Sequence, residues 1–371
     1  MTVSTVHENE APQNQVLWLC DHTTLGLGGP ATTSRTARTT DELVAAVAAA
    51  DAAGEPVLVL GGGSNLVVSD DGFPGTVVLV DTPGASFEET GDTDPGTGEP
   101  VVLLRAEAGV EWDPLVERTV AEGLNGLEFL SGIPGRVGST PIQNVGAYGQ
   151  DVSQTIREVL VYDRRTGERR VLGNAECGFT YRDSAFKGDD RYVVCEVVFA
   201  LRRAKLSRPI AYAEVARTLG AEAGDRVPLE RARETVLGLR RGKGMVLDPD
   251  DPDTRSAGSF FTNPVVTAEE FAEVRARADR RLGADAGMPG HPDGNGNVKL
   301  SAAWLIDRAG FRGHARGTAR VSSKHVLALT TVPGAPTTED LLALARDVRD
   351  GVEEAFGVRL VNEPVMVGVS L

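Results

Sequence analysis

Apolar and polar residues alternate in helical and then extended patterns along the N-terminal part of the chain. Thr39 followed by Glu42 is typical of a helix N-cap, and residues 41–53 keep helical spacing up to Gly54. The run PVLVL at 56–60 and the valines at 67–68 and 77–80 favour extended backbone. The order of helix, strand, glycine turn and strand predicts an α/β start to the fold.

A glycine cluster, GGGSN at 61–65, lies between two of these predicted strands. It does not match the dinucleotide fingerprint that opens a helix, because Gly72, Pro74 and Gly75 soon interrupt helical structure. Glycines in a strand-turn-strand element allow a ligand to approach the backbone closely, and successive N–H groups can bind an anion. A tight hairpin turn without a ligand is the alternative, and this run alone does not separate the two.

Two further segments are rich in glycine but differ in polarity. Residues 82–100 contain turn-forming and acidic residues with little to bury, so we expect a mobile loop or insertion between strands. Residues 123–152 follow a strand and a helix, and they combine many glycines with few charges. A long, weakly charged segment is better explained by backbone that packs against a buried group, and a large planar cofactor would be suitable.

From about residue 205 capped helices replace the strands. A chain of 371 residues is long enough for two domains with a ligand-sized cleft between them. We predict a partly disordered extension at 1–24, a first domain at 25–204 and a second domain at 205–371. Within the second domain the pattern predicts irregular loops at 248–255 and 283–297. The predicted helices of this domain cover residues 212–220, 229–241, 267–282, 301–309 and 338–356.

Composition and charge exclude several classes of protein. With 41% apolar and 25% charged residues and no long apolar run, the sequence is typical of a soluble globular protein without a membrane span. The polar, acidic N-terminus is unlike a signal peptide, and three cysteines without a CxxC motif fit a reducing compartment, so we expect a cytoplasmic enzyme without a zinc site. A net charge of −15 disfavours nucleic acid as a partner. A small anionic ligand would need a local basic pocket, and Lys243 in RRGKG is a candidate for it.

Three polar residues lie in settings that favour catalysis, and each has a structural alternative. Ser259 in SAGSFFTNP lacks the G-x-S-x-G elbow of a hydrolase, and a serine-capped turn buried by two phenylalanines is the alternative. Arg182 in TYRDSAFK can grip a carboxylate or phosphate with two N–H groups, or form a surface ion pair with Asp183. Glu363 lies in an apolar strand, where burial would raise its pKa, or in an edge turn that points it to water.

The order of the short motifs is more specific than any one motif. From about Leu25 to the C-terminus the chain carries GGGSN at 61–65, SGIPGRVGSTPIQNVGAYG at 131–149, YRDSAFK at 181–187, SAGSFFTNP at 256–264, KLSAAWLIDRAGFRG at 299–313 and NEP at 362–364. In this order the sequence resembles the UDP-N-acetylenolpyruvoylglucosamine reductases, flavoenzymes of bacterial peptidoglycan precursor synthesis. The segment PIAY after YRDS resembles the first type within that family.

The resemblance implies an α+β fold, with an FAD-binding domain of the vanillyl-alcohol-oxidase or PCMH type in two subdomains and a C-terminal α+β substrate-binding domain. In that fold GGGSN would cradle the FAD pyrophosphate, and the segment 131–149 would line the isoalloxazine. The implied cofactor-binding residues are Gly61, Gly62, Gly63, Ser64, Asn65, Leu66, Ser131, Gly132, Ile133, Pro134, Gly135, Gly138, Ser139, Asn144, Gly146, Ala147 and Tyr148. The implied substrate-binding residues are Tyr181, Tyr212, Lys243 and Asn263.

The reaction implied by the resemblance is the NADPH-dependent reduction of UDP-N-acetylglucosamine enolpyruvate to UDP-N-acetylmuramate. NADPH would leave its hydride on FAD and depart, and flavin N5 would pass the hydride to the enolpyruvyl methylene. Arg182 and a protonated Glu363 would stabilise charge on the substrate carboxylate, and Ser259 would donate the proton. No metal is needed, and we expect a monomer that binds neither nucleic acid nor membrane. The alternatives are an FAD-dependent oxidase of the same fold that acts on another sugar or alcohol, and a non-catalytic nucleotide-binding module.

Overall fold

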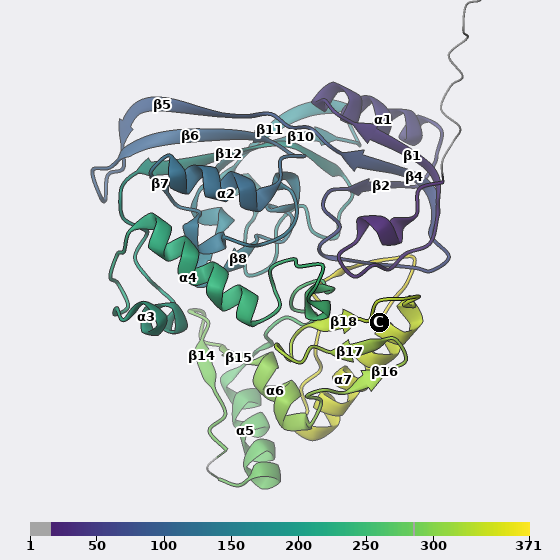
Figure 1. The fold of residues 1–371 in the computed structure, drawn as a ribbon, viewed down its shortest axis with the longest axis vertical. Helices are drawn as coiled ribbons and strands as arrows, with labels where there is room; N and C mark the ends of the chain where they lie inside the picture. The colour runs from purple at the N-terminus through teal and green to yellow at the C-terminus, as the bar shows by residue number, and fades with distance from the viewer. Residues whose placement is uncertain (1–15, 285) are drawn as a thin grey trace, which may run out of the picture.

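A parallel sheet opens the fold, as the α/β pattern predicts. The computed structural model describes residues 16–284 and 286–371, and Figure 1 shows their arrangement. Strands β1 (Ala31–Ala37), β4 (Phe73–Val80) and β2 (Val57–Leu60) pair in the order β1-β4-β2. Helix α1 (Thr40–Ala52) packs on this sheet, and Thr39 caps the helix by accepting a hydrogen bond from the Glu42 N–H.

An antiparallel sheet forms the second subdomain. Its main path is β11 (Glu168–Gly173), β10 (Ile156–Asp163), β12 (Tyr192–Arg203), β6 (Pro100–Glu107) and β5 (Ala85–Thr93), and β7 (Leu124–Asn125) also pairs with β12. Helix α2 (Trp112–Ala121) contributes the buried Trp112, whose ring centroid lies 5.8 Å from that of Phe199 in β12. The two sheets fill the upper part of Figure 1.

The prediction of a mobile loop at 82–100 is wrong. Most of this segment is β5, the edge strand of the antiparallel sheet, and the hairpin turn that joins it to β6. Ion pairs fix the hairpin, because Asp94 lies 2.5 Å from Arg202 and Glu99 lies 2.7 Å from Arg226. Most side chains of β5 are exposed, so the strand lacks the alternation of apolar and polar residues by which it could be predicted.

The glycine-rich segment 123–152 is largely buried, as expected. It contains only short elements: β7, η2 (Glu128–Leu130), η3 (Val137–Ser139), β8 (Gly146–Ala147) and β9 (Gln150–Asp151), and η4 (Val152–Gln154) follows it. Close packing explains one of the glycines, because a Cβ on Gly138 would lie 2.5 Å from the Cβ of Ala108. The backbone of this segment therefore lies directly against the end of β6.

The predicted helices of the second half are confirmed within a few residues. They are α3 (Ala213–Leu219), α4 (Leu229–Gly242), α5 (Ala268–Leu282), α6 (Ala302–Ala309) and α7 (Thr338–Phe356). Two small antiparallel sheets accompany them, β13 (Val265–Val266) with β15 (Val298–Leu300) and β14 (Gly290–Pro292), and β16 (Ala315–Arg316) with β17 (Ala319–Val321) and β18 (Leu329–Thr331). Strand β14 lies inside the stretch expected to be irregular, whereas 248–255 contains only the short turn η6 (Pro252–Thr254).

The hydrophobic cores do not divide at residue 204, the predicted boundary between the two domains. Helices α3 and α4 share a core with Phe129 of the first half, and α4 also packs against α2. The core around α5, α6 and α7 begins after α4 and includes Leu25 and Leu27 from the N-terminal part of the chain. The described end of the predicted N-terminal extension is also ordered, since η1 (Leu19–His22) buries Leu19, while residues 1–15 lie outside the described residues.

The last strand returns to the first half of the chain. Strand β19 (Val365–Val367) pairs in parallel with β3 (Leu66–Val68), the strand that follows the glycine cluster. This pairing places the segment before β19 beside the GGGSN turn, where the Asn65 amide donates to the Glu363 carbonyl at 3.4 Å. Within the residues that the structure describes, no helix is long and apolar enough to cross a membrane.

Candidate active site

A cavity of about 250 Å³ lies where the two glycine-rich segments face the C-terminal domain. Its first wall is the turn after β2, and its second wall is the segment between η2 and β8. The loop before Phe260 and the segment before β19 close it from the other side. Of the predicted cofactor residues, this cavity is lined by Gly61, Gly63, Ser64, Asn65, Leu66, Ile133, Pro134, Gly135, Ser139 and Gly146.

The two glycine-rich walls are in direct contact. A Cβ built on Gly62 would lie 2.7 Å from the Cα of Gly135, so glycine is required for this approach. The Ser64 hydroxyl donates to the Pro134 carbonyl at 3.1 Å, and the Asn65 amide donates to the Gln143 side chain at 2.9 Å. These contacts leave a narrow surface of bare backbone, which is the surface that a phosphate-bearing cofactor requires.

A second hollow of about 530 Å³ lies on the other side of the same glycine turns. It shares Gly61, Pro134, Gly135 and Arg136 with the first cavity and adds Gly62 and residues 21–24. A dinucleotide is long enough to need two connected compartments, with its phosphates at the shared wall. The residues present therefore fit FAD. Arg136 belongs to the wall common to both hollows, and its guanidinium pairs with Asp81 at 3.2 Å.

Arg182 and Glu363 meet in the first cavity. The Arg182 Nε lies 3.4 Å from the Glu363 Oε1, and the guanidinium also donates to the backbone carbonyls of Asn144 and Gly146. Glu363 is thus the acidic partner of Arg182, in place of the surface pair with Asp183 considered from the sequence. Burial raises the pKa of Glu363, and the positive charge of Arg182 opposes part of that rise.

Ser259 lines the same cavity as Arg182 and Glu363. The next two residues, Phe260 and Phe261, are both 1% exposed, so their burial in the core anchors the segment that holds the serine at the cavity surface. The Glu363 N–H donates to the Phe260 carbonyl at 2.8 Å, which holds the serine and the glutamate on adjacent segments. The arrangement combines a hydroxyl proton donor, a carboxyl group with a raised pKa and a guanidinium.

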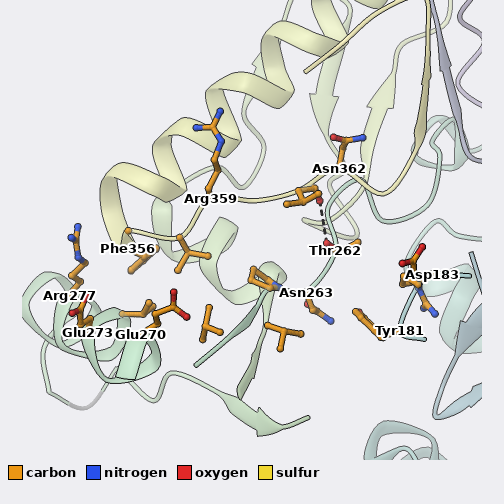
Figure 2. A pocket seen from close by; sticks show the side chains of 18 of the residues that line it. Tyr181, Asp183, Thr262, Asn263, Glu270, Glu273, Arg277, Phe356, Arg359 and Asn362 are labelled. Carbon is orange, nitrogen blue, oxygen red and sulfur yellow. Dashed lines mark hydrogen bonds between the residues drawn. The ribbon is translucent and has the colours of Figure 1, made fainter. Parts of the chain in front are cut away.

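The predicted substrate residues form two groups. Tyr212 contacts the ring of Tyr148 edge-on at 5.5 Å between centroids, and the Lys243 Nζ lies 5.6 Å from the same ring and 2.5 Å from Glu214. Tyr181 and Asn263 instead line a groove of about 800 Å³ (Figure 2). Arg182 belongs to the lining of the same groove. Arg182 is therefore the predicted site residue common to the groove and the cavity.

The remaining predicted cofactor residues are not part of the described lining of the first cavity. Gly62 lines only the second hollow, and Tyr148 packs between Tyr212 and Lys243. The Asn144 side chain binds the Thr180 carbonyl and the Ser153 N–H, so it supports the loop that carries Arg182. Four more predicted residues are absent from the described lining of both hollows: Ser131, Gly132, Gly138 and Ala147.

Sequence reasoning missed several residues of the site. Lys187 lines both the cavity and the groove, although it belongs to the YRDSAFK motif. Arg240 is a buried guanidinium at the cavity, and its Nε has no hydrogen-bond partner among the described residues. Lys299 places its Nζ 4.8 Å from the Tyr181 ring. Burial and the nearby positive charge of Lys243 lower the pKa of His325 to about 4, so this histidine is neutral at pH 7. Lys187, Lys299 and Arg240 lie in YRDSAFK, KLSAAWLIDRAGFRG and RRGKG, which could have indicated them, whereas His325 lies in none of the quoted motifs.

Fold and site together define a flavoprotein oxidoreductase. Residues 34–173 match the model of the FAD binding domain, and residues 250–367 match that of the C-terminal domain of UDP-N-acetylenolpyruvoylglucosamine reductase. The chain belongs to the UDP-N-acetylenolpyruvoylglucosamine reductases, a family of flavoproteins of peptidoglycan synthesis. This membership confirms the predicted FAD-binding domain followed by a substrate-binding domain.

Relatives from several bacteria cover almost the whole chain. The UDP-N-acetylenolpyruvoylglucosamine reductase of Thermobifida fusca is 62% identical over 95% of this chain and 97% of its own length. That of Streptomyces coelicolor is 59% identical over 94% of this chain and 88% of its own length. The crystal structure of the Thermus caldophilus enzyme (MurB) superposes with a TM-score of 0.62 at 26% identity, and covers 95% of this chain and 98% of the other.

Proposed function

We propose that this chain reduces the enolpyruvyl ether of UDP-N-acetylglucosamine enolpyruvate with NADPH, and that Arg182, Ser259 and Glu363 carry the second half-reaction. The observation that supports the proposal is the convergence of these three residues on the cavity that both glycine-rich segments line. They come from three distant parts of the sequence, so their meeting is a property of the fold.

The glycine turns and their neighbours hold the cofactor in this proposal. Backbone N–H groups of residues 61–65 would hold the FAD phosphates, and Ile133, Pro134 and Gly146 of the first cavity would hold the flavin ring. When bound, FAD takes a hydride from NADPH and supplies it to the enolpyruvyl methylene. The described lining of the first cavity includes neither cysteine nor histidine, whereas His22 lines the second hollow.

Arg182 and Glu363 bind the substrate carboxylate and stabilise the charge that develops on it. The guanidinium is already oriented by the carbonyls of Asn144 and Gly146, so little reorganisation is needed when the substrate arrives. Burial keeps Glu363 protonated to higher pH than an exposed glutamate, which allows its O–H to donate to a carboxylate oxygen. Ser259 then donates its proton to the carbon next to that carboxylate.

The UDP part of the substrate binds outside the reacting centre. Tyr212 and Lys243, which both pack on Tyr148, hold the diphosphate from the side of α4. Asn263 and Tyr181 contact the substrate from the groove side, with Lys299 as an additional positive charge. These residues position the enolpyruvyl group and take no part in proton transfer.

A single chain supplies all of these residues, so we propose that the enzyme acts as a monomer. An anaerobic titration tests the function itself: NADPH should bleach the flavin absorbance, and the UDP-enolpyruvyl sugar should restore it in a one-to-one ratio. Restoration by oxygen but not by the UDP-sugar would favour an oxidase and contradict the proposal. Light scattering after size exclusion measures the mass in solution, and a dimer would refute the monomer.

A further inference from the structure

Arg182 has a backbone conformation that is unusual for its residue type. Its φ is +57°, at the second central position of a tight turn closed by hydrogen bonds of 3.0 and 3.4 Å between Thr180 and Asp183. Glycine or asparagine is preferred at this position, because a side chain makes the left-handed conformation unfavourable. Such a conformation persists only where surrounding contacts impose it, and it often marks a functional residue.

Lys187 supplies the contact that holds this turn. Its Nζ donates a hydrogen bond of 2.7 Å to the carbonyl oxygen of Arg182 itself. The loop between the two residues is fixed in turn, because the Ser184 hydroxyl donates to the Ile142 carbonyl at 2.6 Å. Arg182 is thus held at both ends: the lysine holds its peptide, and the carbonyls of Asn144 and Gly146 hold its guanidinium.

The position of Lys187 also affects the charge of the site. Its side chain lines both the cavity and the groove, and Figure 2 labels Tyr181 and Asp183 at one end of that groove. The charged groups that act on Glu363 are Arg182 and Lys187, and both lower the pKa that burial raises. Loss of the ammonium would release the Arg182 peptide and raise the pKa of Glu363 further.

We propose that Lys187 is a positioning residue for the reduction of the enolpyruvyl group, because its ammonium holds the Arg182 peptide in the left-handed conformation that directs the guanidinium to Glu363. The inference rests on the proposed function. In this proposal Lys187 does not contact the reacting atoms. The role should therefore be visible in the second half-reaction and absent from the first.

The experiment compares Lys187→Met, Lys187→Arg and Lys205→Met in the FAD-loaded enzyme. Methionine keeps the apolar stem and removes the ammonium, arginine keeps the charge, and Lys205 is an exposed lysine that serves as the matched control. Anaerobic stopped-flow absorbance follows flavin reduction by NADPH and reoxidation by the UDP-enolpyruvyl sugar between pH 6 and pH 10. Bound FAD and the temperature of unfolding are measured for each variant.

Lys187→Met should reduce flavin at the parent rate and reoxidise it roughly 10- to 100-fold more slowly, as expected for a misplaced catalytic group. The fall of the reoxidation rate at high pH, where Glu363 ionises, should move to higher pH. Lys187→Arg should recover part of the rate, and Lys205→Met should match the parent. Reoxidation at the parent rate, equal loss of both half-reactions, or an unshifted pH profile would overturn the inference.

The proposed function is tested separately by the parent enzyme. If the parent fails to reoxidise with the UDP-sugar, the proposed function is wrong. If the parent reoxidises and Lys187→Met does so equally well, only the role of Lys187 is wrong. Should Lys187→Met not fold, Lys187→Arg and Lys187→Gln carry the same comparison.

Discussion

Replacement of Gly62 by alanine tests the contact between the two glycine-rich walls. A Cβ at this position would lie 2.7 Å from the Cα of Gly135, whereas ordinary contacts begin at 3.4 Å, so the walls must separate by about 0.7 Å. Overpacking of this kind costs about 1–3 kcal/mol. The free protein can relieve the overlap by moving the loops apart, but bound FAD needs them at the original spacing. The Kd for FAD should therefore rise roughly 5- to 150-fold, since about 1.4 kcal/mol corresponds to tenfold.

The assay is a fluorescence titration of the apoprotein with FAD, with Gly238→Ala as the control. Gly238 lies within α4, and a Cβ there would have no heavy atom within 4 Å, so alanine should leave the Kd unchanged and stabilise the helix by about 1 kcal/mol. Gly62→Val should retain no flavin. Valine is excluded at position 62 by the close approach to Gly135 and not by backbone conformation, because the residue with a positive φ is the next one, Gly63, at +59°. A Kd for Gly62→Ala within twofold of the parent would refute this role of the glycine cluster.

Three further predictions concern charged groups. Arg182→Lys should lose about 2–4 kcal/mol of transition-state stabilisation, because an ammonium cannot bind a carboxylate through two parallel N–H groups. The value of kcat/KM for the UDP-sugar measures this loss, and turnover like that of the parent would contradict the prediction. Burial raises the pKa of Glu363 above its unfolded value, so ionisation of this carboxyl group opposes folding as the pH rises. In urea unfolding, the free energy of unfolding of Glu363→Gln should therefore increase relative to that of the parent between pH 4 and pH 8. A difference between the two free energies that does not change with pH would contradict this. Arg202 lowers the pKa of Asp94 to about 2, so the stabilisation by this pair is present above about pH 4 and is lost as the pH falls through 2. Asp94→Asn should be less stable than the parent at pH 7, and the difference should shrink as the pH falls through 2. Equal stability at pH 7 and at pH 2 would show that the pair contributes nothing.

Much of the fold could be predicted because the signals are local. The helix at 268–282 is an example: the Thr267 side chain accepts from the Glu270 N–H at 3.2 Å and the Glu270 carboxylate accepts from the Thr267 N–H at 2.8 Å, as the capping box in the sequence indicates. Strand β5 could not be predicted, because an exposed edge strand buries few apolar side chains. Its hairpin is ordered by pairs with Arg202 and Arg226, which are distant in the sequence.

The sequence offers the candidate site residues one by one, but it does not predict the geometry that brings them together. Glu363 has a short-range signal, an acidic residue in an apolar strand. Its contact with Asn65, which the pairing of β19 with β3 makes possible, joins residues 298 positions apart. The glycine-rich motif also contains residues that pack against other parts of the protein, such as Gly138 against Ala108. The sequence does not distinguish these residues from those that face the cavity. Arg240 opens the RRGKG run that pointed to Lys243, but the sequence does not show that its side chain is buried with an Nε that has no hydrogen-bond partner among the described residues.

The most direct test of the account is the reoxidation of reduced flavin in Ser259→Ala, followed by anaerobic stopped-flow absorbance. Ser259 lies in the cavity with Arg182 and Glu363 but is assigned only the proton transfer to the substrate carbon. The variant should bind FAD and reduce it with NADPH as the parent does, and reoxidation by the UDP-enolpyruvyl sugar should slow by about 10²–10⁴-fold, with partial recovery in Ser259→Cys. Equal loss of the NADPH half-reaction, or reoxidation at the parent rate, would contradict the assignment of Ser259 as the proton donor.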